Sequence, residues 1–587
     1  MRASAVAASV LRLPKGVSMT TDSPARMTHR QVLEALTGLL LGMFVSMIAG
    51  TVVSTSMPVI VHDLGGDQAA YTWVITSTLL TTAISTPIWG KLADLFNRKL
   101  LIQIALILFV LATAAAGFAQ DTTMLIAFRA VQGLGAGGLA ALSQVIMADI
   151  ISPRERGRYM GLFGAVMAVA TVGGPLLGGW ITDTINWRWN FFVALPFAVA
   201  ALIILQKTLH VSTERRRKVS IDYVGIVLLS AAVSLLLIWV TNAGTNFDWW
   251  STETVLMVGG ALVATIVFIV VELRVREPLI PLTLFRGRTF TLSVLASISI
   301  GVAMFGTSVY LAQYMQLSRG ASPTDAGLMT LPMMAGLLIA SMVVGQLVTR
   351  FGKWKPYLIL GSVLLIAGSA LLSTLHYDTN FALVSVYMFL TGAGVGMTMQ
   401  NLVLIVQNVA KPAEMGVASS GVTFFRSLGG TIGVSVMGAL LANKITDLFT
   451  TGKDDLMAAI AKTGDKAQEV AAQLSSGTLP EVRLLPEPVR SLVEDFYAQA
   501  ISHSFLIGVP LAVLSLVAIL FIPNAPLTRM TTSERAKAAQ SAPAEHRPAE
   551  DAAEVAIADA EALAGAPTGT VQVVSHRTRE TASDGDL

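Results

Sequence analysis

Long apolar stretches recur along the chain from Val32 to Ile522, and they constrain its fold more than any other feature. A helix needs about 20 predominantly apolar residues to cross a hydrocarbon core about 30 Å thick. About fourteen stretches of this length are present, and their spacing leaves no room for a large soluble domain. Only 13% of the residues are charged, roughly half the share in soluble domains. The sequence therefore predicts an all-α integral membrane protein.

The basic residues are distributed unevenly between the loops. The predicted spans are 33–57, 71–90, 100–119, 122–147, 157–180, 190–206, 222–242, 254–271, 289–316, 327–349, 357–375, 382–407, 418–442 and 503–522. The short loops after odd-numbered spans hold only Arg188 and Arg319. The loops after even-numbered spans hold Lys91, Arg98, Lys99, Arg154, Arg156, Arg158, Lys207, Arg215, Arg216, Arg217, Lys218, Arg274, Arg276, Arg286, Arg288, Arg350, Lys353, Lys355 and Lys411. Because Lys and Arg accumulate in cytoplasmic loops, we expect a multi-pass plasma-membrane protein with both termini in the cytoplasm.

Three stretches recur at nearly one spacing, which indicates an internal duplication. GKLADLFNRK begins at Gly90, and GQLVTRFGKW follows 255 residues later. RAVQGLGAG at Arg129 is echoed by MFLTGAGVG after 259 residues, and VGGPLLGG at Val172 more weakly by LGGTIGVS after 256. The sequence therefore predicts two six-helix halves, 33–207 and 289–522, separated by a linker with two inserted helices at 208–288.

Three further segments lie outside the predicted spans. Residues 1–32 form a cytoplasmic leader, within which Met19 is the expected start of the chain. On the outer face, 443–502 interrupts the second half, with helical spacing over 453–473; it is a cap that docks a cell-envelope partner, or an unspecialised long loop. The tail, 523–587, is rich in Ala, Glu and Pro and is expected to be disordered, with a transient helix at 549–564.

Sequence signatures of enzymes are missing from the chain. It contains no cysteine, its seven histidines show no metal-ligand clustering, and it has no GxxxxGK[ST], HExxH or GxSxG motif. We therefore expect no enzyme, no metal, no cofactor and no nucleic-acid partner. The expected partners are the lipid bilayer and a small hydrophobic substrate, and the expected state is a monomer.

GKLADLFNRK resembles the loop between the second and third helices of the major facilitator superfamily, GxLaDrxGrkxxl. The agreement includes Gly90, Asp94, Arg98 and Lys99, whereas Asn97 stands where the family usually has Gly. This resemblance implies the major facilitator fold and alternating access. It also implies that Gly90, Asp94, Arg98 and Lys99 act as a conformational latch, a contact made in one state and broken in the other.

Other stretches carry the same resemblance, which covers roughly 35–525. AFRAVQGLGAG, with Arg129 and Gln132, resembles the fourth-helix RxxQGxGxA pattern, and WRWNFF at Trp187 resembles the entry to the sixth helix. FFRSLGGTIG, with Arg426, and YMQLSRGASPTDAG, from Tyr314, resemble second-half signatures of the fourteen-helix drug/proton antiporter branch. VGGPLLGG resembles the fifth-helix GPxxGG antiporter pattern, at Gly173, Gly174, Pro175, Gly178 and Gly179.

Physical arguments leave alternatives open for two of these motifs. Asp94 can pair with a cation or with the positive N-terminus of the span at 418–442. Alternatively, the basic loop is only a topology signal with one solvated aspartate. The glycines around Pro175 permit close helix packing with a local bend, so they serve as a hinge for antiport or as a packing site.

The first span departs from the branch, which typically has LDxTIVxxALP. Here the stretch is IAGTVVSTSMP, and Ala49 replaces the aspartate. The remaining carboxylates near the spans lie at span ends: Glu34, Asp149, Asp222, Glu253, Glu272 and Asp325. A membrane-embedded acid is the usual proton carrier. The resemblance implies a proton-coupled exporter of hydrophobic drugs. Because the aspartate is missing from the first span, two alternatives stay open. One is an exporter of an endogenous lipid or metabolite with weak or no proton coupling, and the other is a non-transporting membrane sensor.

Neutral polar side chains and one cation remain to line a pathway. The candidates are Ser54, Thr55, Gln132, Gln313, Tyr314, Gln400 and Asn401. Arg129 lies roughly 10 Å deep in its span at 1.5 Å per residue, where a charge is costly. Its counterpart in the second half is Met388, so the fold does not require a charge there. We expect Arg129 to line the cavity, held by hydroxyls of the first span, and to engage an anionic or carbonyl-bearing substrate or a proton-relaying water chain.

Overall fold

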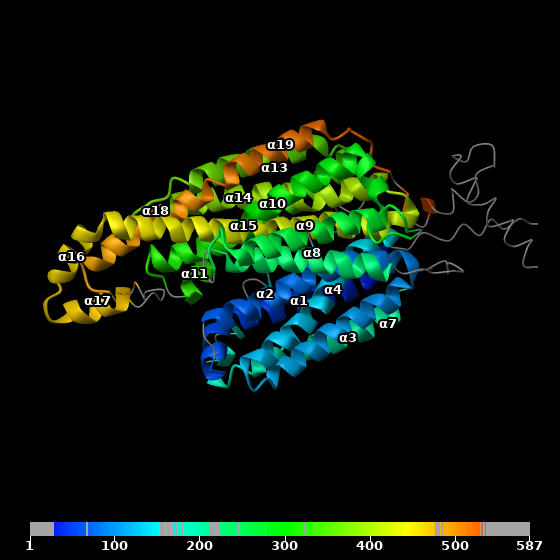
Figure 1. The fold of residues 1–587 in the computed structure, drawn as a ribbon. Coiled ribbons are helices and arrows are strands. Elements are labelled where there is room, and N and C mark those ends of the chain that lie inside the picture. The colour runs from blue at the N-terminus through cyan, green and yellow to red at the C-terminus, as the bar shows by residue number, and fades with distance from the viewer. Residues whose placement is uncertain are drawn as a thin grey trace, which may run out of the picture. The chain divides into compact units, whose positions relative to one another are not determined.

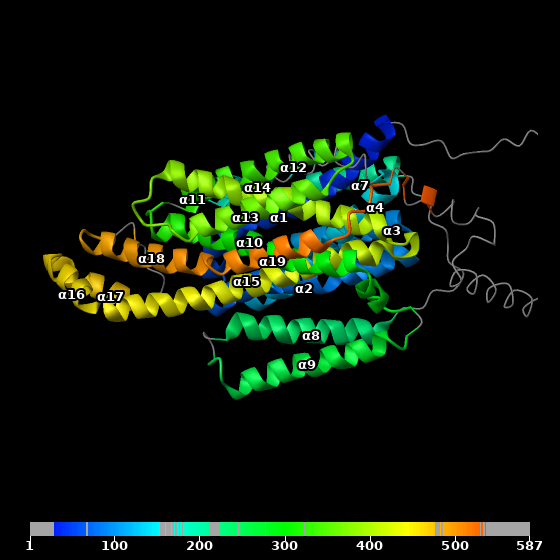
Figure 2. The same cartoon turned by 90° about the horizontal axis from the view of Figure 1, so that it is seen from above.

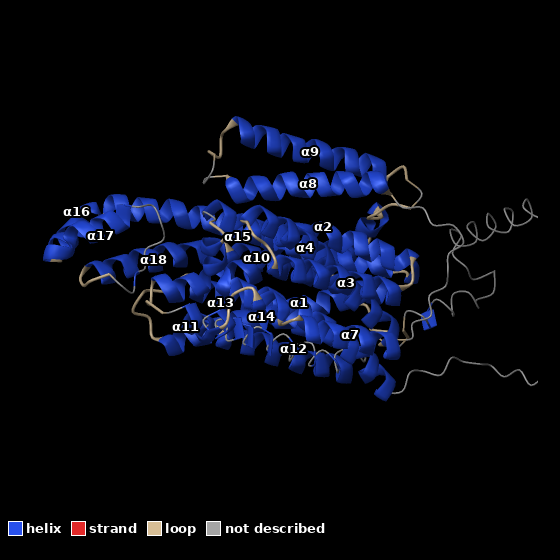
Figure 3. Ribbon diagram, turned by 90° about the horizontal axis from the view of Figure 1, so that it is seen from below, coloured by secondary structure: helices blue, strands red, loops and turns tan. Residues whose placement is uncertain are grey.

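A computed structural model describes residues 29–531 and 534–535, apart from 66–67, 153–158, parts of 160–183, 210–221, 244–246, 276, 322, 476–481, 483–484 and 529. Residues 1–532 form one compact unit and 533–587 another. The predicted leader lies largely outside the described residues, and so do most of the predicted tail and its transient helix. The account below concerns the first unit, whose described part contains helices and loops but no β-strand (Figure 3).

The first half is a bundle of helices that pack along their length. It consists of α1 (His29–Asp63), α2 (Gln68–Leu95), α3 (Arg98–Gly117), α4 (Thr122–Ile150), α6 (Trp189–Phe192) and α7 (Leu195–Thr208). α4 packs against α2, α3 and α1, and α1 also packs against α7. The predicted span at 190–206 is two helices instead of one. Pro196 lies in the first turn of α7, where its missing N–H costs no helical hydrogen bond.

The inserted pair forms a hairpin of α8 (Tyr223–Asn242) and α9 (Thr252–Glu272). α8 packs against α2 of the first half and α15 of the second, as Figure 2 shows. Leu237 and Leu229 belong to one buried cluster with Ile84 of α2 and Phe424 of α15. The hairpin therefore covers the line along which the two halves meet.

The second half begins with a short 3-10 helix, η1 (Leu282–Arg286). Its long helices are α10 (Arg288–Leu317), α12 (Leu331–Phe351), α13 (Lys355–Leu372), α14 (Phe381–Val409), α15 (Met415–Thr451), α18 (Val489–Phe505) and α19 (Gly508–Phe521), with the shorter α11 (Pro323–Met329) and η2 (Pro412–Glu414). The predicted spans at 327–349 and 503–522 are each interrupted. The new helices α12 and α19 carry a proline, Pro332 or Pro510, in their first turn.

The predicted outer insertion is largely helical in its described part. α15 runs past the expected end at 442 to Thr451, and α16 (Lys453–Ala461), η3 (Gly464–Lys466) and α17 (Ala467–Ser475) follow before α18 returns (Figure 1). We call this segment, α16 to α17, the cap. One helix was expected over 453–473; Gly464, at φ +61°, breaks it. Ile460 and Val493 are buried with Tyr314 of α10, so the cap packs on the second half.

The described helices are compatible with the predicted number of spans. Twelve helical stretches are long and apolar enough to cross a membrane, and three of them, Trp189–Thr208, Asp325–Phe351 and Val489–Phe521, run over the interruptions described above. α2 matches a further predicted span, and the last, 157–180, falls largely on residues outside the described ones. α1 begins and α19 ends at the same end of the bundle (Figure 1). We call it the basic end, because it carries Lys91, Arg98, Lys99, Lys353, Lys355 and Lys411; the end with α16 and α17 is the opposite end.

Candidate site at the boundary between the two halves

Asp94 joins the two halves at the basic end. It lies in the last turn of α2, and its carboxylate accepts hydrogen bonds from the backbone N–H groups of Gly416 (2.7 Å) and Val417 (3.0 Å). These groups belong to the first turn of α15, where N–H groups lack helical partners and the helix dipole is positive. Arg98 lies 3.7 Å from the same carboxylate. Asp94 thus makes both contacts that the sequence analysis considered, with a cation and with a helix N-terminus.

Gly90 allows the two helix backbones to approach closely at this contact. A Cβ atom at Gly90 would overlap the hydroxyl of Ser420, and one at Gly416 would overlap the carbonyl oxygen of Gly90. Any larger side chain must therefore push α2 and α15 apart. Gly90 and Asp94, one turn apart on α2, make this boundary together.

Arg98 and Lys99 behave differently, although both belong to the predicted latch. Arg98 pairs with the buried carboxylate of Asp149 on α4 and donates from Nε to the Ala93 carbonyl at 2.9 Å. Lys99 donates to the carbonyl of Gln206 on α7 at 2.7 Å. Its ammonium group is therefore engaged within the first half and makes no described contact across the boundary.

Asn97 and Lys91 complete the loop. The Asn97 side chain caps α3 by accepting from the backbone N–H groups of Lys99 (2.9 Å) and Leu100 (3.3 Å), which accounts for an asparagine where the family usually has glycine. Lys91 pairs with Glu277 at 2.8 Å. The end of α2 is thus also tied to the segment that follows α9.

A second contact between the halves consists of amides. The side chain of Gln144 on α4 donates to that of Gln400 on α14 at 3.3 Å, and the two residues are 256 positions apart. The contact therefore joins α4 to α14, its corresponding helix in the second half, although the repeat that pairs Arg129 with Met388 places these two glutamines three positions away from equivalence. Gln407 donates to the Gln144 carbonyl (3.3 Å) and to the hydroxyl of Ser419 on α15 (2.8 Å). Gln144 was not among the predicted site residues.

Arg129 is buried inside the first half, at 6% exposure. Its Nη1 donates to Gln132 Oε1 at 2.7 Å and its Nε to the carbonyl of Val74 on α2 at 3.4 Å; Gln132 in turn donates to Thr113 on α3 at 2.7 Å. No carboxylate among the described residues pairs with it. Neutral acceptors on α2 and α4 therefore hold this guanidinium.

Of the hydroxyls expected to support Arg129 from the first span, the structure describes only that of Ser56. Ser56 of α1 bonds to Thr182 (2.6 Å) and receives the Asn190 amide (2.7 Å). This hydroxyl is therefore committed to neighbours within the first half. The side chains of Ser54 and Thr55 lie outside the described residues.

Arg426 on α15 is the second buried arginine, also at 6% exposure. Its Nη1 has no hydrogen-bond partner, and no described carboxylate pairs with it. The Arg426 backbone packs tightly against Gly301 of α10. Unlike Arg129, Arg426 thus keeps a buried donor unsatisfied.

The remaining cavity candidates are not brought together. Tyr314 is fully buried in the second half and donates to the His376 carbonyl at 2.6 Å. Asn401 donates to Met397 of its own helix at 2.6 Å, and the buried Gln313 Oε1 has no partner. Of this group only Gln400 contacts the first half through a described hydrogen bond.

The described glycines of the GPxxGG stretch pack against α1. A Cβ atom at Gly174 would overlap Thr51, and one at Gly178 would overlap the carbonyl oxygen of Val52, whereas one at Gly173 would meet nothing within 4 Å. Pro175 and Gly179 lie outside the described residues. Two of these glycines have a packing role, and their function as a hinge stays a prediction.

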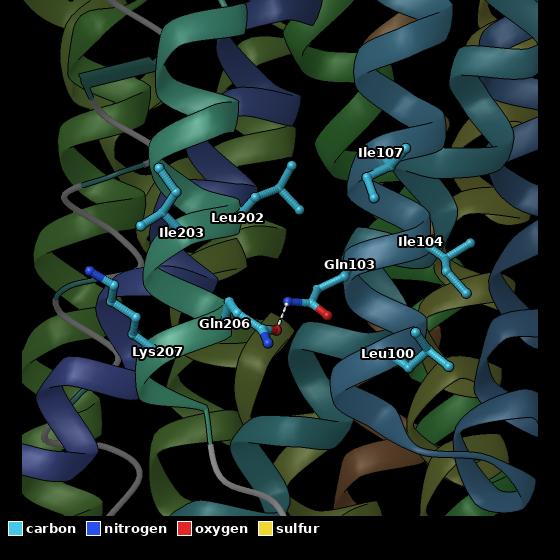
Figure 4. A pocket seen from close by; sticks show the side chains of 8 residues that line it. All are labelled: Leu100, Gln103, Ile104, Ile107, Leu202, Ile203, Gln206 and Lys207. Carbon is cyan, nitrogen blue, oxygen red and sulfur yellow. Dashed lines mark hydrogen bonds between the residues drawn. The ribbon is translucent and has the colours of Figure 1, made fainter.

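A groove of about 440 Å³ lies between α3 and α7, within the first half (Figure 4). Gln103 donates to Gln206 across it at 2.9 Å. Leu100 and Ile104, which line it, are 56% and 44% exposed. Such apolar exposure is typical of a lipid-facing surface, so this groove is not the candidate site. Its lining residues are Leu100, Gln103, Ile104, Ile107, Leu202, Ile203, Gln206 and Lys207.

Comparison with solved structures identifies the fold. The chain superposes on the proton:xylose symporter XylE with a TM-score of 0.54 at 14% identity, covering 87% of this chain and 99% of that one. The human organic anion transporter MFSD10 gives 0.52 at 14% identity, over 82% and 99%. At this identity the likeness concerns the fold alone. The predicted major facilitator fold is confirmed.

Comparison with curated sequences identifies the family. The multidrug transporter protein MdtP of Bacillus subtilis is 35% identical over 78% of this chain and 83% of its own length. Multidrug resistance protein 3 of the same organism is 32% identical over 86% and 97%, and the transporter Rv1877 of Mycobacterium tuberculosis is 36% identical over 84% and 69%. The family description "Major Facilitator Superfamily" matches residues 39–434. The chain belongs to the major facilitator superfamily, and it is a multi-pass membrane transporter rather than an enzyme.

Proposed function

We propose that this transporter exports hydrophobic drugs or related small molecules from the cytoplasm or inner leaflet by alternating access. The observation that carries the proposal is the contact of Asp94 with the N-terminus of α15. It joins the halves at the basic end, and it must break for a cavity to open there. The multidrug transporters among the relatives, MdtP and multidrug resistance protein 3, support the substrate class.

The orientation in the membrane is part of the proposal. The basic end faces the cytoplasm of a plasma membrane, since Lys and Arg accumulate on that side. The described structure then corresponds to a state closed toward the cytoplasm, and the cap of α16 and α17 lies outside. We keep this cap as the proposed docking element for an envelope partner.

Opening of the basic end has a free-energy cost that the substrate or a proton must offset. Asp94 would lose two hydrogen bonds to an ionised group, each contributing about 1.5–3 kcal/mol. Gln144 and Gln400 would also separate. Protonation of Asp94 would weaken its contact with the positive helix end. We therefore propose proton antiport, with Asp94 in place of the mid-membrane aspartate that Ala49 replaces.

A second candidate is export of an endogenous lipid or metabolite with weak or no proton coupling. The described parts of α1 contain carboxylates only near the helix ends, at Glu34 and Asp63, so this helix offers no acid at mid-membrane. A neutral pathway would suit such a substrate better than it suits a cationic drug.

Efflux from proteoliposomes decides between these candidates. A fluorescent hydrophobic dye is loaded, and its release is followed with and without an imposed pH gradient. Proton antiport predicts that the gradient accelerates release and permits accumulation against the dye gradient. Release that only equilibrates the dye, at a rate independent of pH, would rule out antiport and support facilitated diffusion.

A further inference from the structure

Arg426 lies in the first third of α15, at a depth that corresponds to the middle of a membrane. It is eleven positions beyond Met415, the first residue of α15, or about 16 Å from the basic end at 1.5 Å per residue. A hydrocarbon core is about 30 Å thick. Because an arginine at mid-membrane is costly, it is expected to have a partner or a function.

No partner is found on the described helices around it. α2, which also packs on α15, has Asp94 as its only acidic residue, and that carboxylate is engaged at the α15 N-terminus. α10 and α14 contain no acidic residue, α15 has only Asp447 and α4 only Asp149. Asp447 pairs with Lys444 and Asp149 with Arg98, both far from mid-membrane. Arg426 Nη1 remains buried without a hydrogen bond. Since leaving a buried charged donor unsatisfied costs more than leaving a neutral one, its partner is expected to come from outside the protein.

Helix geometry places Arg426 at the level where the halves meet. Gln407 of α14 donates to Ser419 of α15, and these helices run in opposite directions. Seven positions, two helical turns, separate Ser419 from Arg426 and also Gln407 from Gln400. Arg426 therefore lies on the face of α15 that carries Ser419, and Gln400 lies on the face of α14 that carries Gln407. The two residues are at a similar depth in the membrane. Gln400 meets Gln144 of the first half.

The hydrogen-bond donors at this depth favour the binding of an anion. Arg426 offers a planar fork of donors that matches the oxygens of an acidic group, and amide N–H₂ groups of Gln144 and Gln400 can add further donors. We propose that Arg426 binds the acidic group of an amphipathic substrate anion, a carboxylate, sulfonate or phosphate, while the apolar part lies among the helices. This assignment rests on the proposed transport function and names its substrate class.

The structure also separates the two arginines. Arg129 is satisfied by Gln132 and the Val74 carbonyl, so its fork is already engaged within the first half. The anion site thus belongs to Arg426 rather than to Arg129, which the sequence had singled out.

Binding of three pyrene probes to the purified full-length protein tests the proposal. Pyrenesulfonate is a permanent anion, pyrenemethanol is neutral, and pyrenylmethyl-trimethylammonium is a permanent cation. We expect only the sulfonate to raise the Tm of the protein in a saturable manner. Sodium sulfate at the same concentration should have no such effect; an equal shift with sulfate would indicate a site for inorganic anions and overturn the substrate assignment.

Substitutions at Arg426 test the residue itself. Arg426→Gln should weaken pyrenesulfonate binding roughly tenfold or more, the size expected for hydrogen bonds to a charged group, and Arg426→Lys should weaken it less. Arg350→Gln, at an exposed arginine of α12, is the matched control and should bind as the unmodified protein does. Unchanged binding by Arg426→Gln would overturn the proposal.

A structural role would give a different result. Without ligand, Arg426→Gln should have a Tm equal to or above that of the unmodified protein, because it removes an unsatisfied buried charge. A markedly lower Tm would mean that Arg426 serves the fold, and it would overturn the proposal. Dye efflux by the same preparations is read separately: efflux without sulfonate binding contradicts the anion site alone, and sulfonate binding without efflux contradicts the transport function alone.

Discussion

The two copies of the duplicated loop make different contacts. In the first half, 90–99 places Asp94 on the N-terminus of α15. In the second half, the equivalent of Asp94 is Thr349, whose hydroxyl bonds to the Gly345 carbonyl of its own helix at 2.9 Å. Trp354, the equivalent of Lys99, donates to the Ala525 carbonyl at 2.9 Å. The second loop is therefore engaged entirely within its own half.

This difference shows that equivalent positions in the two halves of a duplicated protein need not make the same contact. A carboxylate can bridge to a helix N-terminus across the boundary, whereas a threonine hydroxyl is satisfied by its own helix. Gln144 and Gln400 differ from this pattern, since α4 and α14, which correspond in the two halves, each contribute one amide to the same contact. The boundary between the halves thus combines a charged contact, whose carboxylate comes from the first half alone, with a neutral contact to which both halves contribute an amide.

The largest effect is expected from Asp94→Asn. The amide keeps the size of the side chain but loses the charge that binds the α15 N-terminus, so transport should fall at least about tenfold, the factor that corresponds to about 1.4 kcal/mol. Dye efflux from proteoliposomes measures this loss. Thr349→Val is the matched control at the equivalent position and should transport normally. Equal losses in both variants would contradict the asymmetry of the two loops.

Labelling at Ser420 reports the same contact directly. The chain contains no cysteine, so Ser420→Cys introduces a single thiol at a fully buried position against Gly90. We expect slow maleimide labelling, and roughly tenfold faster labelling when Asp94→Asn is added. Labelling that is equally slow in both proteins would show that Asp94 does not hold the basic end closed.

A smaller but clear effect is expected at Arg129, whose second-half equivalent is Met388. Arg129→Ala removes the hydrogen bonds to Gln132 and Val74, so we expect normal membrane insertion but several-fold slower efflux, and partial recovery with Arg129→Lys. Met388→Leu should be silent, because it conserves volume in the core. An alanine variant with full activity would contradict a role in transport, and its degradation before insertion would indicate a structural one.

Replacement of Gln144 or of Gln400 should have moderate effects of equal size. Gln144→Ala and Gln400→Ala each remove one hydrogen bond, worth about 1 kcal/mol. Each should accelerate labelling of Ser420→Cys about fivefold, and the double variant should add little, because both changes remove the same contact. Asn401→Ala, at a side chain bonded to its own helix, is the control. If the accelerations in the two single variants multiplied in the double variant, the two amides would not act as a pair.

The smallest effect is expected at Lys99 and Trp354. Both side chains bond to carbonyls within their own half. Lys99→Gln should therefore leave efflux within about twofold of the unmodified protein, since an exposed charge contributes little to stability. A loss comparable to that of Asp94→Asn would mean that Lys99 belongs to the latch after all.

The sequence by itself determined the membrane class, the approximate spans, the duplication and the location of the loop contact at Asp94. Apolar length and loop charge act locally, so composition predicts them. Helix breaks were less visible, because a proline in a first turn ends one helix and begins another without interrupting the apolar pattern, as at Pro196 and Pro332.

Only the tertiary structure decided which polar side chains share partners. Arg129 bonds to the carbonyl of Val74, 55 positions away on α2, a partner that the sequence analysis did not expect. Lys99 was expected in the latch and bonds to α7. Hydrogen-bond partners depend on how helices rotate and cross, which neighbouring residues do not encode. For the same reason, only the tertiary structure distinguishes Arg426, whose Nη1 has no hydrogen bond among the described residues, from Arg129, which bonds to Gln132 and Val74.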